Sequence, residues 1–129
     1  MKMKKTINTE KYKCVGFICN TVNQKLRNAN FNCGYANGYV AIPPNHPLHE
    51  VDYNMIDIEI HGGLTFSELV DSTFLKNFIS AEFIDGKVPD KYWVLGFDTM
   101  HVGDTLDSCP REYVIDEVNK LKKILENWE

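Results

Sequence analysis

Two short polar segments hold the residues of this sequence that are best suited to chemistry. The first is Asp57-Ile58-Glu59-Ile60-His61-Gly62-Gly63, with Thr65 just beyond it, and the second runs from Gly96 to Asp104. Each combines carboxylates with a histidine, whose ordinary pKa near neutrality suits it to act as an acid, a base or a metal ligand. We expect the two segments to meet at one site.

The first segment predicts a strand with a row of titratable groups on one face. Apolar and polar residues alternate over 53–61, so three side chains stand in line about 6.6 Å apart: Asp57, Glu59 and His61. One interpretation is the polar wall of a pocket, where Gly62-Gly63 lets a ligand approach the backbone. The other is an exposed sheet face that ends in a glycine turn. A turn alone requires neither His61 before the glycines nor Thr65 after them, which favours a site at that end.

The second segment places an ionisable side chain at every third position, directly after an apolar stretch: Asp98, His101 and Asp104. Loops that follow a rigid element often carry functional groups. A histidine between two carboxylates is typical of a general base oriented by an acid, or of one corner of a metal site. Carboxylates that make turn hydrogen bonds beside a solvated histidine are the alternative.

The candidate residues follow from these two segments. For catalysis they are His61, Asp98 and His101, and the candidate ligand-binding set is Asp57, Glu59, His61, Gly62, Gly63, Thr65, Asp98, His101 and Asp104. Two histidines with several carboxylates would suit zinc, manganese or non-haem iron if they converged. No spacing such as H-E-x-x-H is present, so the metal and any other cofactor stay undetermined.

Other reactive residue types carry weaker signals. His46 and His49 lie in a loop before the first segment, which could overhang the same site. The four cysteines lack a C-x-x-C spacing and are interpreted as small apolar residues. No G-x-S-x-G is present, so a serine nucleophile is not expected.

The elements that position these residues can be predicted from residue types. Strands are expected at 12–19, 53–61 and 91–97. Asn37-Gly38 predicts the two-residue turn of a hairpin between the extended halves of 33–42.

Loops are expected over the polar residues 20–32, over the proline-rich residues 43–52 and over 80–90 around Asp85-Gly86. Mixed periodicity over 67–79 predicts a short middle helix.

The carboxyl end predicts an amphipathic helix that covers the sheet. Ser108 or Cys109 would cap it, with Pro110 in the first turn, and its apolar stripe is Val114, Val118, Leu121, Leu125 and Trp128. Strands grouped before a terminal helix indicate an α+β fold with a mainly antiparallel sheet of about four strands. We expect a single domain over 1–129, with a loosely ordered basic end at 1–10.

Composition narrows the classes of protein. The chain has 129 residues and a net charge of −4; residues 1–30 hold seven basic residues and one acid, and the remainder seven basic residues and seventeen acids. An acidic folded part makes direct nucleic-acid binding unexpected. The apolar runs are too short to span a membrane, and the start lacks the apolar stretch of a secretory signal. We expect a cytoplasmic protein with reduced thiols.

Three motifs together resemble a family of small uncharacterised proteins carried by bacteriophages and prophages. They are His61-Gly62-Gly63-Leu64-Thr65-Phe66, the stretch from Gly96 to Asp104, and the stretch from Asn37 to His49. The sequence departs from the family pattern at Thr99-Met100, where Cys-Ala is expected, and at Ser67-Glu68. The resemblance implies a phage or prophage origin in a bacterial host, and phage accessory proteins often counter host defence.

Three functions therefore stay open. The first is a binding protein that sequesters a small polar ligand, including one derived from a nucleotide, although an acidic wall repels phosphate. The second is a small hydrolase that uses carboxylate and histidine acid–base groups, with or without a metal. The third is a direct inhibitor of a host defence protein such as a nuclease. A small molecule or a host protein is the expected partner, and self-association is left open.

Overall fold

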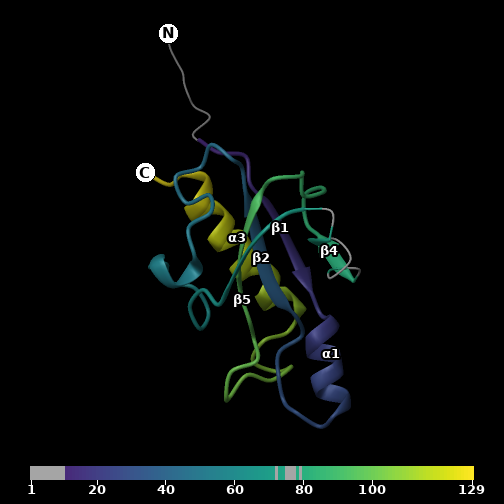
Figure 1. Ribbon diagram of the computed structural model, residues 1–129. Coiled ribbons are helices and arrows are strands. Elements are labelled where there is room, and N and C mark those ends of the chain that lie inside the picture. The colour runs from purple at the N-terminus through teal and green to yellow at the C-terminus, as the bar shows by residue number, and fades with distance from the viewer. Residues whose placement is uncertain (1–10, 72, 75–77, 79) are drawn as a thin grey trace.

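The computed structural model describes residues 11–71, 73–74, 78 and 80–129, and centres on one antiparallel sheet (Figure 1). The strand order is β3-β5-β2-β1-β4, and every neighbouring pair is antiparallel. The strands are β1 Val15–Cys19, β2 Asn37–Ile42, β3 Phe66–Leu69, β4 Ala81–Phe83 and β5 Trp93–Phe97. The expected α+β single domain is confirmed, with five strands rather than four.

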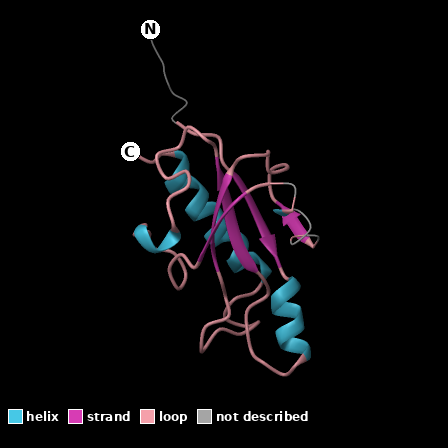
Figure 2. Cartoon of the chain, viewed as in Figure 1, coloured by secondary structure: helices cyan, strands magenta, loops and turns pink. Residues whose placement is uncertain are grey.

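Two α-helices and one 3-10 turn complete the described elements (Figure 2): α1 Thr21–Asn28, η2 Tyr53–Met55 and α3 Arg111–Glu126. Helix α3 packs on one face of the sheet through the expected stripe, in which Val114, Val118, Leu121 and Leu125 are fully buried. The cap is Pro110, which was expected inside the first turn, rather than Ser108 or Cys109, so the helix begins at Arg111. Among the described residues, no helix is long and apolar enough to cross a membrane.

The opposite face of the sheet carries a second, aromatic core. Phe17 and Tyr39 stack with ring centroids 5.0 Å apart, and Phe66, Phe74 and Phe78 pack edge-on around them. The ends of β1, β2 and β5 meet at one edge of the sheet, where the register pairs Cys19 with Asn37 and Gly38 with Phe97. Helix α1 and the loop after β5 leave the sheet at this edge (Figure 1), which therefore brings the second polar segment beside the aromatic core.

The prediction of a strand over 53–61 is wrong. Residues 53–55 form η2, and 56–60 belong to no ladder. The alternation still predicted burial, since Ile58 and Ile60 are buried against the core of α3 while Asp57 and Glu59 are exposed. An extended segment packed on a helix shows the same alternation as a strand, but its backbone pairs with no neighbouring strand.

The prediction of a hairpin turn at Asn37-Gly38 is also wrong, because both residues belong to β2. Gly38 allows two side chains to pack closely on the backbone, because a Cβ at this position would lie 2.4 Å from the Phe97 ring and 2.6 Å from Val118. Loops were expected over 20–32 and 80–90, but the first range contains helix α1 and the second contains strand β4. The middle helix expected from Ser67 does not begin there, because Phe66–Leu69 is β3, and part of the remainder falls outside the described residues.

Candidate functional site

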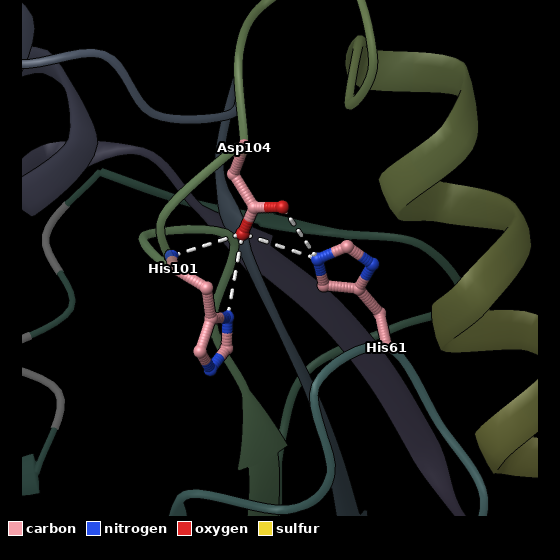
Figure 3. A group of neighbouring side chains, drawn as sticks. All are labelled: His61, His101 and Asp104. Carbon is pink, nitrogen blue, oxygen red and sulfur yellow. Dashed lines mark hydrogen bonds and ion pairs between the residues drawn. The ribbon is translucent and has the colours of Figure 1, made fainter.

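The two polar segments meet, as expected, and a buried carboxylate joins their histidines (Figure 3). His61 Nε2 lies 3.0 Å from Asp104 Oδ1 and 3.1 Å from Oδ2. His101 Nδ1 lies 3.3 Å from Asp104 Oδ2. We call His61, His101 and Asp104 the histidine–aspartate cluster. Its members come from the turn before β3 and from the loop after β5.

His61 is held by helix α3 on the side away from Asp104. Its Nδ1 lies 2.7 Å from the hydroxyl of Tyr113, and its backbone N–H donates to Glu117 Oε1 over 3.0 Å. Tyr113 and Glu117 are four residues apart, so they share one face of the helix. A neutral His61 satisfies both ring contacts, with Tyr113 donating to Nδ1 and Nε2–H donating to Asp104. The ring is thereby fixed in place from both sides.

Asp104 is the centre of the cluster. Only 8% of the residue is exposed. Burial raises the pKa of its carboxyl group, but hydrogen bonds from the His61 ring and from the His101 backbone N–H and ring outweigh burial, so the pKa lies below its usual range. Asp104 therefore stays ionised and accepts hydrogen bonds from both histidines near neutral pH.

His101 is the accessible member of the cluster, with 39% of its side chain exposed. Its Nδ1 also lies 3.3 Å from Asp98 Oδ1. Asp98 is itself fixed, because Thr65 Oγ1 donates to its Oδ2 over 2.9 Å and the Met100 N–H donates to Oδ1 over 2.9 Å. Two carboxylates thus orient Nδ1. The other ring nitrogen, Nε2, forms no hydrogen bond with any residue in the described part of the chain.

The loop that carries Asp98 and His101 is anchored by a buried residue between them. Thr99 is fully buried and donates from Oγ1 to the carbonyl of Ala36 over 2.8 Å, while its N–H donates to Asn37 Oδ1 over 3.0 Å. Thr99 therefore has a structural role in this loop. Asn23 of α1 donates to Asn37 and Thr99 as well, which ties the helix to the loop.

Cys109 lies beside the cluster without being activated by it. Its Sγ is 3.7 Å from Asp104 Oδ1 and 3.9 Å from His61 Nε2. Burial, with the nearby Asp104 carboxylate, raises the pKa of the Cys109 thiol. A protonated, buried thiol is a poor nucleophile.

A cavity of about 360 Å³ opens next to Asp98, on the aromatic face of the sheet. Its lining combines aromatic residues of that face with polar residues: Tyr39, Phe66 and Phe78, with Asn37, Thr65, Glu68 and Asp98. Burial raises the pKa of Tyr39 to about 12, and electrostatic repulsion from Cys19 and Asp98 adds to the shift. Thr65 and Asp98 therefore belong to the cavity and also support the cluster.

Some candidates from the sequence lie outside this site. Asp57 and Glu59 are exposed and form no hydrogen bond or ion pair with another described residue, so the structure gives them no contact with the cluster. Gly62 adjoins the His101 ring, whereas a Cβ on Gly63 would meet only open space. His46 and His49 do not overhang the site: their Nε2 atoms bind the carbonyls of Leu125 and Lys91, respectively.

The sequence did not identify the cavity, Tyr113 or Glu117 as parts of the site. The signal that could have identified both side chains is their spacing of four residues, which predicts a shared helical face. The cavity lining comes from the four strands β1, β2, β3 and β5, from helix α1 and from adjoining loops, and strand register brings these elements together.

Comparison with known proteins does not identify a function for this site. Neither the protein-family models, nor the curated proteins, nor the solved structures compared with the chain gave a match.

Proposed function

We propose that the protein binds a small neutral or cationic molecule in the cavity beside Asp98. The observation that carries this proposal is the cavity itself: about 360 Å³ of space with aromatic walls and a few convergent polar groups. Cavities of about 300–1,000 Å³ with this kind of lining are typical of small-molecule sites. The carboxylate of Asp98 and the side chains of Thr65 and Asn37 would orient the molecule.

The lining residues indicate the chemical class of the ligand. Asp98 and Glu68 supply carboxylates to the cavity lining, and no lysine or arginine lines the cavity within the described residues. An anionic phosphate would meet repulsion there, while hydroxyl and amino groups would find acceptors. Aromatic walls favour a flat ring, because stacking and edge contacts stabilise it. A nucleoside or an aromatic amine combines these properties.

The biological role that we propose rests on the phage resemblance. Phage accessory proteins often counter host defence, and a protein that binds a nucleoside-like molecule could withdraw a host signal from use. On this proposal the protein acts in the cytoplasm of the bacterial host. A nucleotide-derived signal would place its base and sugar in the cavity and its phosphates outside.

Calorimetric titration with adenosine and with adenosine 5′-monophosphate tests the ligand class. We expect adenosine to bind more tightly than the monophosphate, and Asp98→Asn to weaken adenosine binding by about tenfold, the equivalent of about 1.4 kcal/mol. Asp57→Asn is the matched control and should leave the affinity unchanged, because Asp57 is an exposed carboxylate that forms no hydrogen bond or ion pair with a described residue. Equal loss in both variants, or tighter binding of the monophosphate, would contradict the proposal.

One observation favours hydrolysis as a second candidate function. The two carboxylates at His101 Nδ1 orient the ring, and its Nε2 forms no hydrogen bond with a described residue. A histidine oriented in this way can act as a general base toward a water molecule. Incubation with adenosine followed by mass spectrometry would show a product, and His101→Gln should abolish product formation while binding persists. Unchanged adenosine after incubation would leave binding as the function.

A further inference from the structure

We propose that the histidine–aspartate cluster binds a divalent first-row transition-metal ion. The ligands would be His61 Nε2, His101 Nδ1 and a carboxylate oxygen of Asp104. This inference concerns a site beside the cavity and does not depend on the proposed function, because the metal ligands are separate from the cavity walls.

The separations between ligand atoms suit a metal ion. The three candidate atoms all lie within 4.8 Å of one another, and the carboxylate lies 3.0 Å from His61 Nε2 and 3.3 Å from His101 Nδ1. Bonds of about 2.0–2.2 Å from zinc to nitrogen and oxygen place neighbouring ligand atoms roughly 3.3–3.6 Å apart in tetrahedral geometry. The carboxylate meets this requirement for His101 Nδ1, and its separations of 3.0 and 3.1 Å from His61 Nε2 need to lengthen only slightly when a metal replaces the hydrogen bond. Small shifts of the His101 ring, within the space that Gly62 leaves it, would adjust the third separation.

The groups around the cluster are those that support metal-binding histidines. A histidine ligand usually donates its other ring N–H to an oxygen, which fixes the ring and the tautomer. Tyr113 places a hydroxyl 2.7 Å from His61 Nδ1, the nitrogen not assigned to the metal. When a metal replaces the proton on Nε2, the neutral ring takes the other tautomer, and Nδ1–H donates to that hydroxyl oxygen. The His61 backbone is fixed by Glu117. The Gly62 backbone lies against the His101 ring, which limits where the ring can move.

The local charge also favours a cation. Asp98 and Asp104 both contact His101, and Glu117 accepts the His61 N–H. In the described part of the chain, no lysine or arginine forms an ion pair with these three carboxylates. The lysine and arginine ion pairs lie elsewhere: Lys11 with Glu129, Arg111 with Glu82, and Lys122 with Asp85 and Glu126. A divalent ion would neutralise this group of negative charges.

Two histidines and one carboxylate leave at least one coordination position for water or a ligand. That arrangement is typical of reactive rather than purely structural metal sites, which are usually closed by four protein ligands. Cys109 is not assigned as a ligand: its Sγ lies 3.7 Å from Asp104 Oδ1 and 3.9 Å from His61 Nε2, but it does not join the group of ligand atoms that all lie within 4.8 Å of one another. The metal would lie next to Asp98 and hence beside the cavity.

Zinc titration of the protein after EDTA treatment and dialysis tests the site. We expect one zinc ion per chain by calorimetry and native mass spectrometry. His101→Ala should weaken zinc binding more than about 100-fold, beyond what loss of a supporting outer residue costs. The exposure of His101 makes this variant suitable, and circular dichroism would verify its fold. His49→Ala is the matched control, since His49 binds a carbonyl elsewhere, and it should bind zinc as the wild type does.

Long-range nitrogen NMR spectra would identify the ligand atoms, because zinc should shift the signals of His61 Nε2 and His101 Nδ1 but not those of His49. The cobalt-loaded protein should lack a thiolate-to-cobalt charge-transfer band. Equal zinc uptake by wild type and His101→Ala, or the appearance of that band, would overturn the assignment. The zinc titration uses no organic ligand, and the adenosine titration can use metal-free protein, so either proposal can fail alone.

Discussion

The ring of His101 lies directly against the backbone of Gly62. A Cβ at position 62 would fall 2.4 Å from His101 Cε1, and Gly62 has a φ of +66°. Each of the two polar segments therefore limits the conformation of the other.

Gly62→Ala should displace His101 as well as strain the backbone. The positive φ alone costs about 1 kcal/mol in an L-residue, and the clash with the ring should raise the loss of unfolding free energy to about 2–3 kcal/mol. Urea denaturation measures this loss. Gly63→Ala is the control, because Gly63 has a φ of +80° but open space around its Cβ; equal losses in the two variants would show that the His101 contact contributes nothing.

Asp104→Asn should destabilise the protein near neutral pH but not in acid. The pKa of Asp104 is lowered in the folded state, so its stabilising contribution is present above the unfolded pKa and is lost as pH falls through the folded pKa. We expect a loss of about 1–3 kcal/mol at neutral pH, the cost of disrupting buried hydrogen bonds. Urea denaturation from about pH 7 down to about pH 3 should show the wild type and variant converging. A difference that stays constant would contradict this prediction, and Asp57→Asn should show none.

Tyr113→Phe removes the hydroxyl that contacts His61 Nδ1. We expect a loss of about 1 kcal/mol in unfolding free energy and zinc binding weaker by about tenfold or more. Tyr53→Phe is the control, because the Tyr53 side chain is exposed and forms no hydrogen bond with a described residue. Unchanged zinc affinity in Tyr113→Phe would show that this hydroxyl does not support His61 as a ligand.

Tyr39 should make stability depend on pH in the alkaline range. Burial raises its pKa to about 12, so its contribution is fully present below the unfolded pKa of about 10 and declines as pH rises toward the folded value. Tyr39→Phe should therefore show a shallower decline in unfolding free energy above about pH 10. Parallel curves for wild type and variant would contradict the raised pKa, and Tyr53→Phe should follow the wild type.

Residue types predicted much of the site, and the reasons for the errors are physical. The two motifs are rich in ionisable groups, and burying such a group without a partner costs free energy. On this basis His61, Asp98, His101 and Asp104 were expected to meet at one site. The alternation in burial predicted over 53–61 is found from residue 56 onward, whereas residues 53–55 are all exposed. Alternation cannot distinguish a paired strand from an extended segment on a helix.

Long-range packing decided the features that residue types did not indicate. Asn37-Gly38 has strong turn propensity, yet Gly38 is needed in β2 because Phe97 and Val118 approach its backbone closely. Helix α1 is short, has only Val22 and Leu26 as apolar residues, and buries only Asn23. Its sequence therefore lacks the extended apolar stripe that predicts a helix. The cavity depends on strand register, which no local pattern specifies.

The histidine–aspartate cluster joins parts of the chain that are far apart in sequence. His61 is 43 residues from Asp104 and 52 residues from Tyr113, so the unfolded chain does not present them together. A molecule or ion that needs this arrangement binds only the folded protein and must raise its melting temperature. At a free concentration 100 times its Kd, such a ligand adds about 2.7 kcal/mol to the unfolding free energy. Thermal shift can therefore screen metal ions and nucleosides on the unmodified protein before any reaction has been identified.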